Sequence, residues 1–183
     1  MLFLDRKMSS YKYTFKILLL GDGAVGKTSL VQRFIHNKFQ AGYLMTIGME
    51  PYSRFETIKD TRVCLQLWDI AGQDRFASMR QIFFKGSLGA LVTYDITRRQ
   101  SFENLQTWIK EAKTESPRIM LMLVGNKNDL DDLRDVSTEE GKKYAEESGC
   151  IGFIETSAKT GDNVADAFLA MGEEILKGIE SRD

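Results

Sequence analysis

The sequence predicts an α/β fold in three layers, with a six-stranded, mostly parallel sheet, one antiparallel edge strand and helices on both faces. Short apolar strand patterns alternate with amphipathic helical patterns along the 183 residues, which is typical of such folds. Strands such as "KILLLG" and "MLMLVGN" are apolar throughout, as expected where helices cover both faces. The segment "TRVCLQLW" alternates instead and follows "YSRFETI" across the turn Lys59-Asp60, which indicates an antiparallel hairpin.

Six segments have strand patterns, and the longer segments between them have helical patterns. The expected strands are residues 14–20, 52–58, 63–70, 90–95, 119–125 and 152–155. The expected helices are residues 26–37, 101–114, 138–148 and 163–180, with a shorter, irregular helix near 79–84. We expect a single domain over 13–180, an N-terminal extension at 1–12 and a C-terminal end at 181–183. Its ligand should bind at the carboxyl ends of the strands.

Several element boundaries carry chemical signals. Ser137 and Glu140 form a capping box, in which each side chain satisfies a free amide at the start of a helix. Gly149 stands where a left-handed residue ends that helix. The last helix has an apolar stripe that predicts a face packed on the core. Its members are Val164, Phe168, Leu169, Ile175, Leu176 and Ile179.

Composition excludes several classes of protein. Apolar residues make up 43%, charged residues 28%, and the net charge is -1, so bulk charge favours neither nucleic acid nor an anionic membrane. No apolar run approaches the ~18 residues of a membrane span. The two cysteines, Cys64 and Cys150, lack metal-ligand spacing and are expected to be reduced. The start "MLFLDRKMSS" is too short and too charged for a secretory signal.

No lipidation motif is present, because Leu2 replaces the glycine of myristoylation and the chain ends "GIESRD" without the cysteine of prenylation. We therefore expect a cytoplasmic monomer with no transmembrane segment and no nucleic-acid partner. Peripheral association with a membrane stays open as an alternative, although these residues do not encode it.

The stretch "GDGAVGKTSL" matches the P-loop spacing G-x-x-x-x-G-K-T, and it follows a strand and opens a helix, as that motif requires. Backbone N–H groups of such a loop converge on phosphates, helped by the positive end of the helix. Lys27 would reach the terminal phosphates and the Thr28 hydroxyl would bind Mg²⁺. The alternative is a glycine-rich turn with an exposed lysine. The candidate phosphate-binding residues are Gly21, Asp22, Gly23, Ala24, Val25, Gly26, Lys27, Thr28 and Ser29.

Three residues of "LWDIAGQD" extend this site. Asp69 ends a strand, where its carboxylate can hold a water of Mg²⁺. Gly72 can bring its amide to a terminal phosphate without a side chain in the way. Gln73 is neutral and both donates and accepts, so it suits the orientation of an attacking water. The pattern D-x-x-G alone also fits a plain turn after a strand.

Two later segments predict the base. Guanine presents two adjacent donors, N1–H and the 2-amino group, which one carboxylate such as Asp129 in "VGNKND" accepts together, whereas adenine has no such pair. Asn126 can bond the purine edge and the loop, and the Lys127 stem can lie across the ring. In "ETSAK" the amide of Ala158 would face the base oxygen. The candidate guanine-binding residues are Asn126, Lys127, Asp129, Ser157, Ala158 and Lys159.

The set "GDGAVGKT", "TIG", "DIAGQ", "NKND" and "SAK" resembles the Ras superfamily of small GTP-binding proteins over about residues 13–180. The stretches "VCLQLWDIAGQDRF" and "LVTYDITRRQSF" look most like the Rab branch. The resemblance implies a P-loop GTPase fold, bound GTP or GDP with Mg²⁺, and a switch in membrane trafficking or signalling. It also implies that Phe39 packs on guanine, that Tyr43 closes over the phosphates and that Thr46 binds Mg²⁺ and senses the γ-phosphate.

The chain departs from the Rab pattern near both switch segments. Glu50 and Pro51 stand where that branch shows an aspartate and an aromatic residue, and Ile70 and Asp74 flank "AGQ" in place of threonine and glutamate. Two aromatic residues typical of the branch's effector face, Trp68 and Phe83, are retained. Core packing alone would equally explain Trp68.

The resemblance implies slow GTP hydrolysis, with Gln73, Lys27 and Thr46 as catalytic residues. Neither Arg33 nor Arg75 matches a built-in arginine finger, so a partner would supply one and accelerate turnover about 10³- to 10⁵-fold. Effectors, exchange factors and activating proteins would bind through residues 39–51 and 70–83. Two alternatives stay open: a guanine-nucleotide-binding module that scarcely hydrolyses GTP, and an ATP-using P-loop enzyme.

Overall fold

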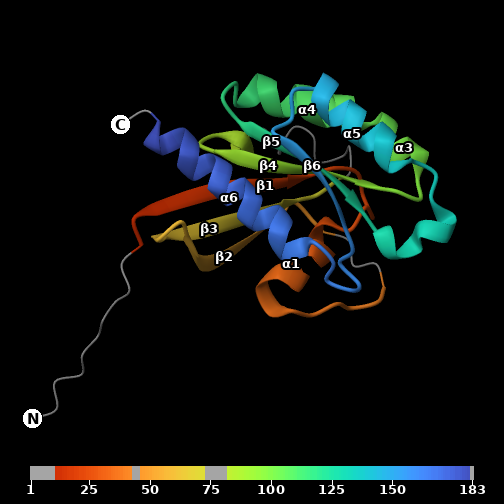
Figure 1. Cartoon of the computed structure of the whole chain (residues 1–183), viewed down its shortest axis with the longest axis horizontal. Helices are drawn as coiled ribbons and strands as arrows, with labels where there is room; N and C mark the ends of the chain where they lie inside the picture. The colour runs from red at the N-terminus through yellow and green to blue at the C-terminus, as the bar shows by residue number, and fades with distance from the viewer. Residues whose placement is uncertain (1–10, 43–45, 73–81, 182–183) are drawn as a thin grey trace, which may run out of the picture.

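The computed structural model describes residues 11–42, 46–72 and 82–181. Within these residues the strands form one sheet in the order β2-β3-β1-β4-β5-β6, flanked by helices (Figure 1). The strands are β1 (Tyr13–Leu20), β2 (Met49–Ile58), β3 (Thr61–Ile70), β4 (Gly89–Asp95), β5 (Met120–Asn126) and β6 (Gly152–Thr156). The helices are α1 (Lys27–His36), α3 (Arg99–Glu103), α4 (Leu105–Glu115), the 3₁₀ helix η2 (Asn128–Leu133), α5 (Thr138–Glu147) and α6 (Val164–Glu180).

The strand pairing confirms the predicted sheet. β1 pairs in parallel with β3 and β4, and β5 pairs in parallel with β4 and β6. β2 lies at the edge and pairs antiparallel with β3, with Ile58 opposite Thr61. The turn between them has φ 46° at Lys59 and 64° at Asp60, the left-handed pair of a two-residue hairpin.

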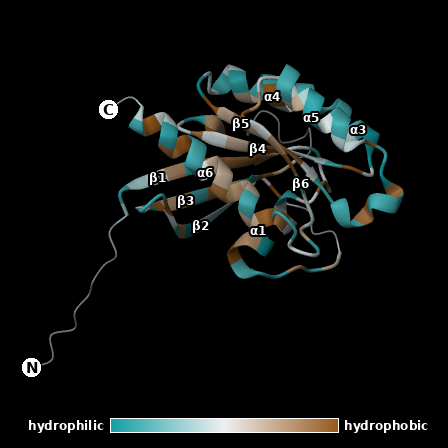
Figure 2. Cartoon of the chain, in the orientation of Figure 1, coloured by the Kyte–Doolittle hydropathy of each residue, from teal (hydrophilic) through white to brown (hydrophobic). Residues whose placement is uncertain are grey.

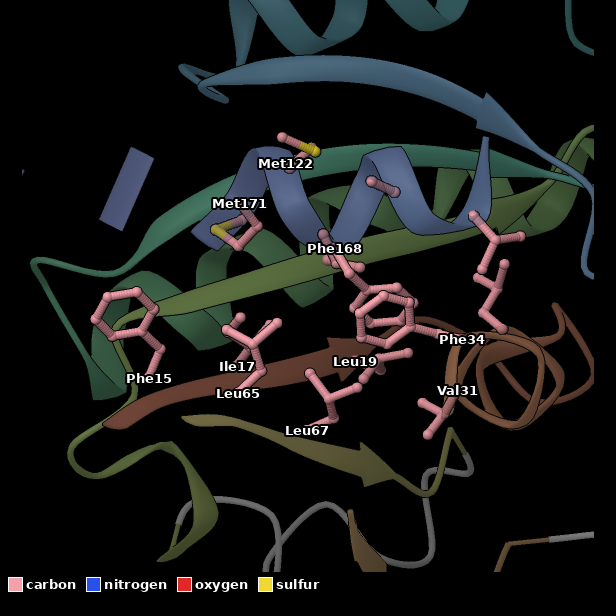
Figure 3. Packing of buried hydrophobic residues seen from close by; sticks show 14 of the residues in the cluster. Phe15, Ile17, Leu19, Val31, Phe34, Leu65, Leu67, Met122, Phe168 and Met171 are labelled. Atoms are coloured by element: carbon pink, nitrogen blue, oxygen red, sulfur yellow. The ribbon is translucent and has the colours of Figure 1, made fainter. Parts of the chain in front are cut away.

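Both faces of the sheet are buried, because successive residues of a strand point to opposite sides. Phe15, Ile17 and Leu19 of β1 belong to the core beneath α1 and α6. Figure 3 shows this core, in which the rings of Phe34 and Phe168 stack at 4.4 Å between centroids. Leu18 and Leu20 belong instead to a second core beneath α4 and α5. Apolar strands therefore lie between helices that turn polar residues outward (Figure 2).

The predicted boundary signals are confirmed. The Ser137 hydroxyl accepts from the Glu140 amide at 3.1 Å, and the Glu140 carboxylate accepts from the Ser137 amide at 2.9 Å. Gly149 follows α5 with φ 68°. The predicted stripe of α6 faces the core through Val164, Phe168, Ile175, Leu176 and Ile179, whereas its sixth member, Leu169, is half-buried and lies outside that cluster.

The structure corrects several expected elements. The helix expected at 101–114 is two helices, α3 and α4, which meet at Asn104. The Thr107 amide bonds to the Asn104 carbonyl at 3.0 Å, three residues back, while the Trp108 amide lies at 3.5 Å from the same oxygen. The turn is thus tightened locally toward 3₁₀ geometry. β2 begins at Met49 rather than at residue 52, and η2 was not expected. Of the helix near 79–84, residues 82–84 are described and helical.

Tyr94 of β4 makes a tight contact with α5. It is fully buried, and its hydroxyl has no hydrogen-bond partner among the described residues. An ideal Cβ on Gly141 would lie 2.5 Å from that hydroxyl oxygen, so α5 approaches the sheet this closely only because residue 141 is glycine.

Tyr94→Phe is therefore expected to raise the free energy of unfolding by about 1 kcal/mol, because it removes a buried donor that has lost its water. The measurement is urea unfolding followed by circular dichroism. Tyr144→Phe is the matched control, since Tyr144 is only half-buried and packs on the same Phe102 ring. A loss of stability in Tyr94→Phe that exceeds the control would contradict this account.

Candidate functional site

A cavity of about 870 Å³ lies beyond the carboxyl ends of β1 and β3. P-loop residues line it together with residues from 38–42 and 46–52. This is the edge of the sheet where a ligand was expected. The cavity is lined by Gly23, Ala24, Gly26, Lys27, Thr28, Ser29, Gln32, Lys38, Phe39, Gln40, Gly42, Thr46, Glu50, Tyr52 and Gly72.

Lys27 lies at the start of α1 and is held inside the P-loop. Its Nζ donates to the carbonyl of Gly21 at 2.7 Å and to that of Asp22 at 2.8 Å. Only 6% of Lys27 is exposed. Because peptide carbonyls turn toward this ammonium group, the loop keeps a buried positive charge beside the amide end of a helix. That arrangement suits a polyanion.

Two of the P-loop glycines, Gly21 and Gly26, are required by the protein's own packing. An ideal Cβ on Gly21 would lie 2.1 Å from the Thr93 carbonyl oxygen, and one on Gly26 would lie 2.2 Å from Nδ2 of Asn126. Both glycines also have left-handed φ values, 134° and 102°. Sequence reasoning assigned these glycines to the close approach of phosphate, and the structure adds a contact with β4 and one with β5.

Gly72 meets the same loop from the other side. An ideal Cβ there would lie 2.4 Å from the carbonyl carbon of Asp22 and 2.5 Å from the Gly23 nitrogen. The backbone that follows β3 therefore touches the P-loop directly, with no room for a side chain.

Three oxygen-bearing side chains converge at the cavity wall. Thr28 Oγ1 donates to Asp69 Oδ2 at 2.5 Å, Thr46 Oγ1 donates to the same oxygen at 3.2 Å, and the two hydroxyl oxygens are 2.8 Å apart. Asp69 is fully buried, and its other oxygen, Oδ1, has no partner among the described residues. Burial raises the pKa of Asp69, and the bond from Thr28 opposes that shift.

This cluster fits Mg²⁺. Hydroxyl and carboxylate oxygens are the hard ligands that Mg²⁺ prefers. Mg²⁺ also keeps several bound waters, which can donate hydrogen bonds to a second carboxylate oxygen. The free Oδ1 of Asp69 is such an acceptor. No group of three histidine, cysteine, aspartate or glutamate side chains with metal-binding geometry occurs in the described part of the chain.

Asn126 joins three segments at the end of β5. Its Nδ2 donates to the Val25 carbonyl at 2.9 Å, and its Oδ1 accepts from Thr156 Oγ1 at 3.1 Å and from the Ala158 amide at 3.3 Å. Only 1% of Asn126 is exposed. The P-loop and the loop after β6 are thus fixed to one another through a single amide group. A contact of Asn126 with the purine edge stays a prediction.

The other residues predicted to bind guanine contact one another, or the P-loop, in the loops that follow β5 and β6. Ser157 Oγ donates to Asp129 Oδ1 at 2.6 Å, and Lys159 Nζ lies 3.6 Å from Asp129 Oδ2. Lys127 Nζ lies 2.6 Å from Asp95 Oδ2 and donates to the Ala24 carbonyl at 3.0 Å. Two loops that are distant in sequence therefore present one carboxylate between a hydroxyl and a lysine.

Two predicted residues, Tyr43 and Gln73, lie outside the described residues, and their roles stay predictions. Phe39 is 40% exposed at the cavity. Sequence reasoning missed Asp95 and Thr156, which orient Lys127 and Asn126. Both are polar residues that end strands, so the rule that ligands bind at carboxyl ends would have selected them.

Sequence reasoning also missed Tyr52, which lines the cavity and accepts a bond from Gln32 Nε2 at 2.9 Å. Burial, and then Glu50, raise the pKa of Tyr52 to about 12. The strand pattern of β2 marked Tyr52 only as one of its alternating residues, which gave no signal of a place in the site.

The site consists of a strand, a phosphate-type loop and a helix that carries a buried lysine, with hard oxygen ligands beside that lysine. This arrangement defines a P-loop nucleotide-binding protein. The Ras family matches residues 16–177. The chain belongs to the Ras family.

Ras-related protein Rab-2B of Dictyostelium discoideum is 45% identical to this chain over 180 residues, which cover 98% of this chain and 89% of the relative. The chain is a Rab-like small GTPase, a switch that hydrolyses GTP. Members of this family bind GTP or GDP with Mg²⁺. The predicted family and activity are confirmed, and the ATP-using alternative and the module that scarcely hydrolyses GTP are set aside.

Proposed function

We propose that the cavity holds the polyphosphate of GTP against residues 21–29, while residues 126–129 and 157–159 read guanine. The observation that carries this proposal is the convergence of Thr28, Thr46 and Asp69 beside Lys27. Thr28 and Thr46 would bind Mg²⁺ directly, and Asp69 would hold it through water. When bound, Mg²⁺ would neutralise charge on the β- and γ-phosphates. Residues 13–180 would form the whole nucleotide-binding domain.

During hydrolysis, the protein's own side chains would stabilise negative charge on the phosphates and position the attacking water. Lys27 would stabilise negative charge on the β–γ oxygens, and Gln73 would orient the attacking water. Arg33 donates to the carbonyls of Ala158 and Lys159 at 2.9 and 2.6 Å. Because Arg33 supports the base-binding loop, it is engaged away from the phosphates. We infer slow turnover alone and acceleration of about 10³- to 10⁵-fold by a partner's arginine.

We propose residues 39–51 and 70–83 as the partner surface. When the γ-phosphate leaves, Thr46 and Gly72 would release these two segments. Ile47 is 72% exposed and Ile82 is 76% exposed, so both large apolar side chains are accessible to a partner. Trp68 lies nearby, with its ring 6.0 Å from that of Phe83. The Rab resemblance leads us to propose a membrane-trafficking role for this surface. No helix among the described residues has the length and apolarity needed to span a bilayer.

The test of this function is release of phosphate in a single turnover. Purified protein loaded with GTP should release one phosphate per protein only when Mg²⁺ is present, and GTP should compete with labelled GDP whereas ATP should not. Protein that binds no purine nucleotide, or binds ATP as well as GTP, would contradict the proposed function.

Thr28→Ala is expected to weaken Mg²⁺ binding to the GDP complex about tenfold, because it removes one hydroxyl ligand while Asp69 and Thr46 remain. The measurement is the rate of GDP release as free Mg²⁺ is lowered, with the midpoint shifted to higher Mg²⁺. Thr107→Ala, on the exposed side of α4, is the control and should keep the wild-type midpoint. An unshifted midpoint in Thr28→Ala would remove Thr28 from the metal site.

A further inference from the structure

Asp22 presents an electrostatic problem. It is the second residue of a loop that collects phosphates, and a carboxylate facing the phosphates would repel them. In the structure this carboxylate points to α4 instead. Oδ1 accepts from Trp108 Nε1 at 2.8 Å, and Oδ2 accepts from Asn104 Nδ2 at 2.7 Å. Asp22 is absent from the residues that line the described cavity.

The next peptide of the loop is held from the same side. The Gly23 carbonyl accepts from Arg98 Nη2 at 2.8 Å. Residues 22–23, which we call the outer turn, are therefore bound by three donors from residues 98–108. With the Gly23 carbonyl fixed on Arg98, the carbonyl oxygen is turned away from the cavity that Gly23 lines. The neighbouring amides can then face a polyanion.

Two features of the donor residues indicate that the fold directs them to the P-loop. Asn104 is the N-cap residue of α4, yet its side chain makes no capping bond. It donates to Asp22 and accepts from Gln100 Nε2 at 3.1 Å. Trp108 is 4% exposed, and a buried indole N–H requires an acceptor. A capping residue and a core aromatic residue are both directed to the P-loop.

We propose that Arg98, Asn104 and Trp108 form a brace that positions the outer turn of the P-loop from behind, and that this brace sets how slowly the protein releases guanine nucleotide. The three are positioning residues, because they act through Asp22 and Gly23. The inference rests on the nucleotide site proposed above. The brace holds the loop before and after hydrolysis, so it affects retention of GDP and GTP alike and alters the bond-breaking step little.

The test compares Trp108→Phe, which keeps the aromatic ring and removes the N–H donor, with Gln106→Ala, an exposed control on the same helix. Trp108→Phe should release a fluorescent GDP analogue about tenfold faster, as expected for a lost bond to a charged group. The rate at which bound GTP is hydrolysed in a single turnover should stay within threefold of the wild-type rate, which corresponds to a change of about 0.6 kcal/mol in the activation free energy. Gln106→Ala should match the wild type in both.

A second measurement separates the brace from a general loss of stability. The chain has two tryptophans, so its indole ¹⁵N–¹H spectrum should contain two signals. Asp22→Ala should move the Trp108 signal and leave that of Trp68 in place. The double variant Asp22→Ala, Trp108→Phe should release GDP no faster than Asp22→Ala alone, since both changes break the same bond.

Asn104→Ala carries the same test if Trp108→Phe does not fold. GDP release within twofold of the wild type in Trp108→Phe or Asn104→Ala, or fully additive effects in the double variant, would overturn the brace. A wild-type protein that retains no guanine nucleotide would overturn the proposed nucleotide site itself, which the wild-type control reveals before any variant is compared.

Discussion

Asp129→Asn is expected to lower the affinity for guanine nucleotides by about 10³-fold or more and to make xanthine nucleotides the preferred ligands. A carboxylate accepts from both N1–H and the 2-amino group of guanine, whereas an amide offers one acceptor and one donor. Its donor would face the 2-amino group, also a donor. In xanthine a carbonyl oxygen replaces that group, so donor and acceptor match again.

The structure indicates that Asp129→Asn disturbs the neighbouring contacts of residue 129 little. The bond from Ser157 Oγ to residue 129, 2.6 Å long, survives because an amide oxygen also accepts. The Lys159 ion pair is lost, but its 3.6 Å separation and the 61% exposure of Lys159 make it weak. The measurement is displacement of labelled GDP by unlabelled GDP, XDP and ADP.

Asp131→Asn is the matched control, because Asp131 lies in the same 3₁₀ helix and pairs with Arg134 at 2.6 Å on the surface. It should keep guanine specificity. An Asp129→Asn protein that still prefers GDP over XDP would show that another group reads the base.

Gly72→Ala is expected to slow single-turnover hydrolysis of GTP about 100-fold, the scale of a displacement of about 1 Å in a reacting site. The added Cβ would lie 2.4 to 2.5 Å from three backbone atoms of residues 21–23. Backbone atoms cannot turn aside as a side chain can, so either the P-loop or the segment after Ile70 must move. Either movement separates groups that act on the same phosphate.

The control is Gly152→Ala at the start of β6, where an added Cβ would find its nearest neighbour, Met122 Cε, at 3.8 Å. That variant should hydrolyse GTP at the wild-type rate. Circular dichroism would verify that both proteins are folded. Wild-type hydrolysis by Gly72→Ala would mean that this contact does not transmit position to the phosphates.

The sheet, its order of elements and the region of the site were predictable because they depend on local pattern. The burial of β1 on both faces follows from its continuous apolar run, and the left-handed turn at Lys59 follows from turn chemistry. The P-loop, "NKND" and "SAK" all follow strands, and parallel strands bring their carboxyl ends to one edge. No tertiary information was needed to place Asp129 near Ser157.

Contacts between distant side chains were not predictable. Trp108 of α4 is 4% exposed, and the helical pattern that predicted an element at 101–114 gives no partner for its N–H. Asn104 divides a helix that the pattern made continuous, and its side chain bonds with Asp22, 82 positions away in the chain. The close approach of Tyr94 and Gly141 likewise links β4 with α5, two elements that a local sequence pattern treats separately.

The exposed edge of the sheet has a consequence for self-association. β2 ends the sheet beside β3, and a free strand edge invites another chain to continue the hydrogen bonding, which leads to aggregates. Pro51 has no N–H to offer, and the strand also carries Glu50, Arg54 and Glu56, of which Arg54 and Glu56 pair at 2.5 Å. Proline and charge both discourage strand addition. Pro51, one of the residues that depart from the Rab pattern, thus also blunts an aggregation-prone edge.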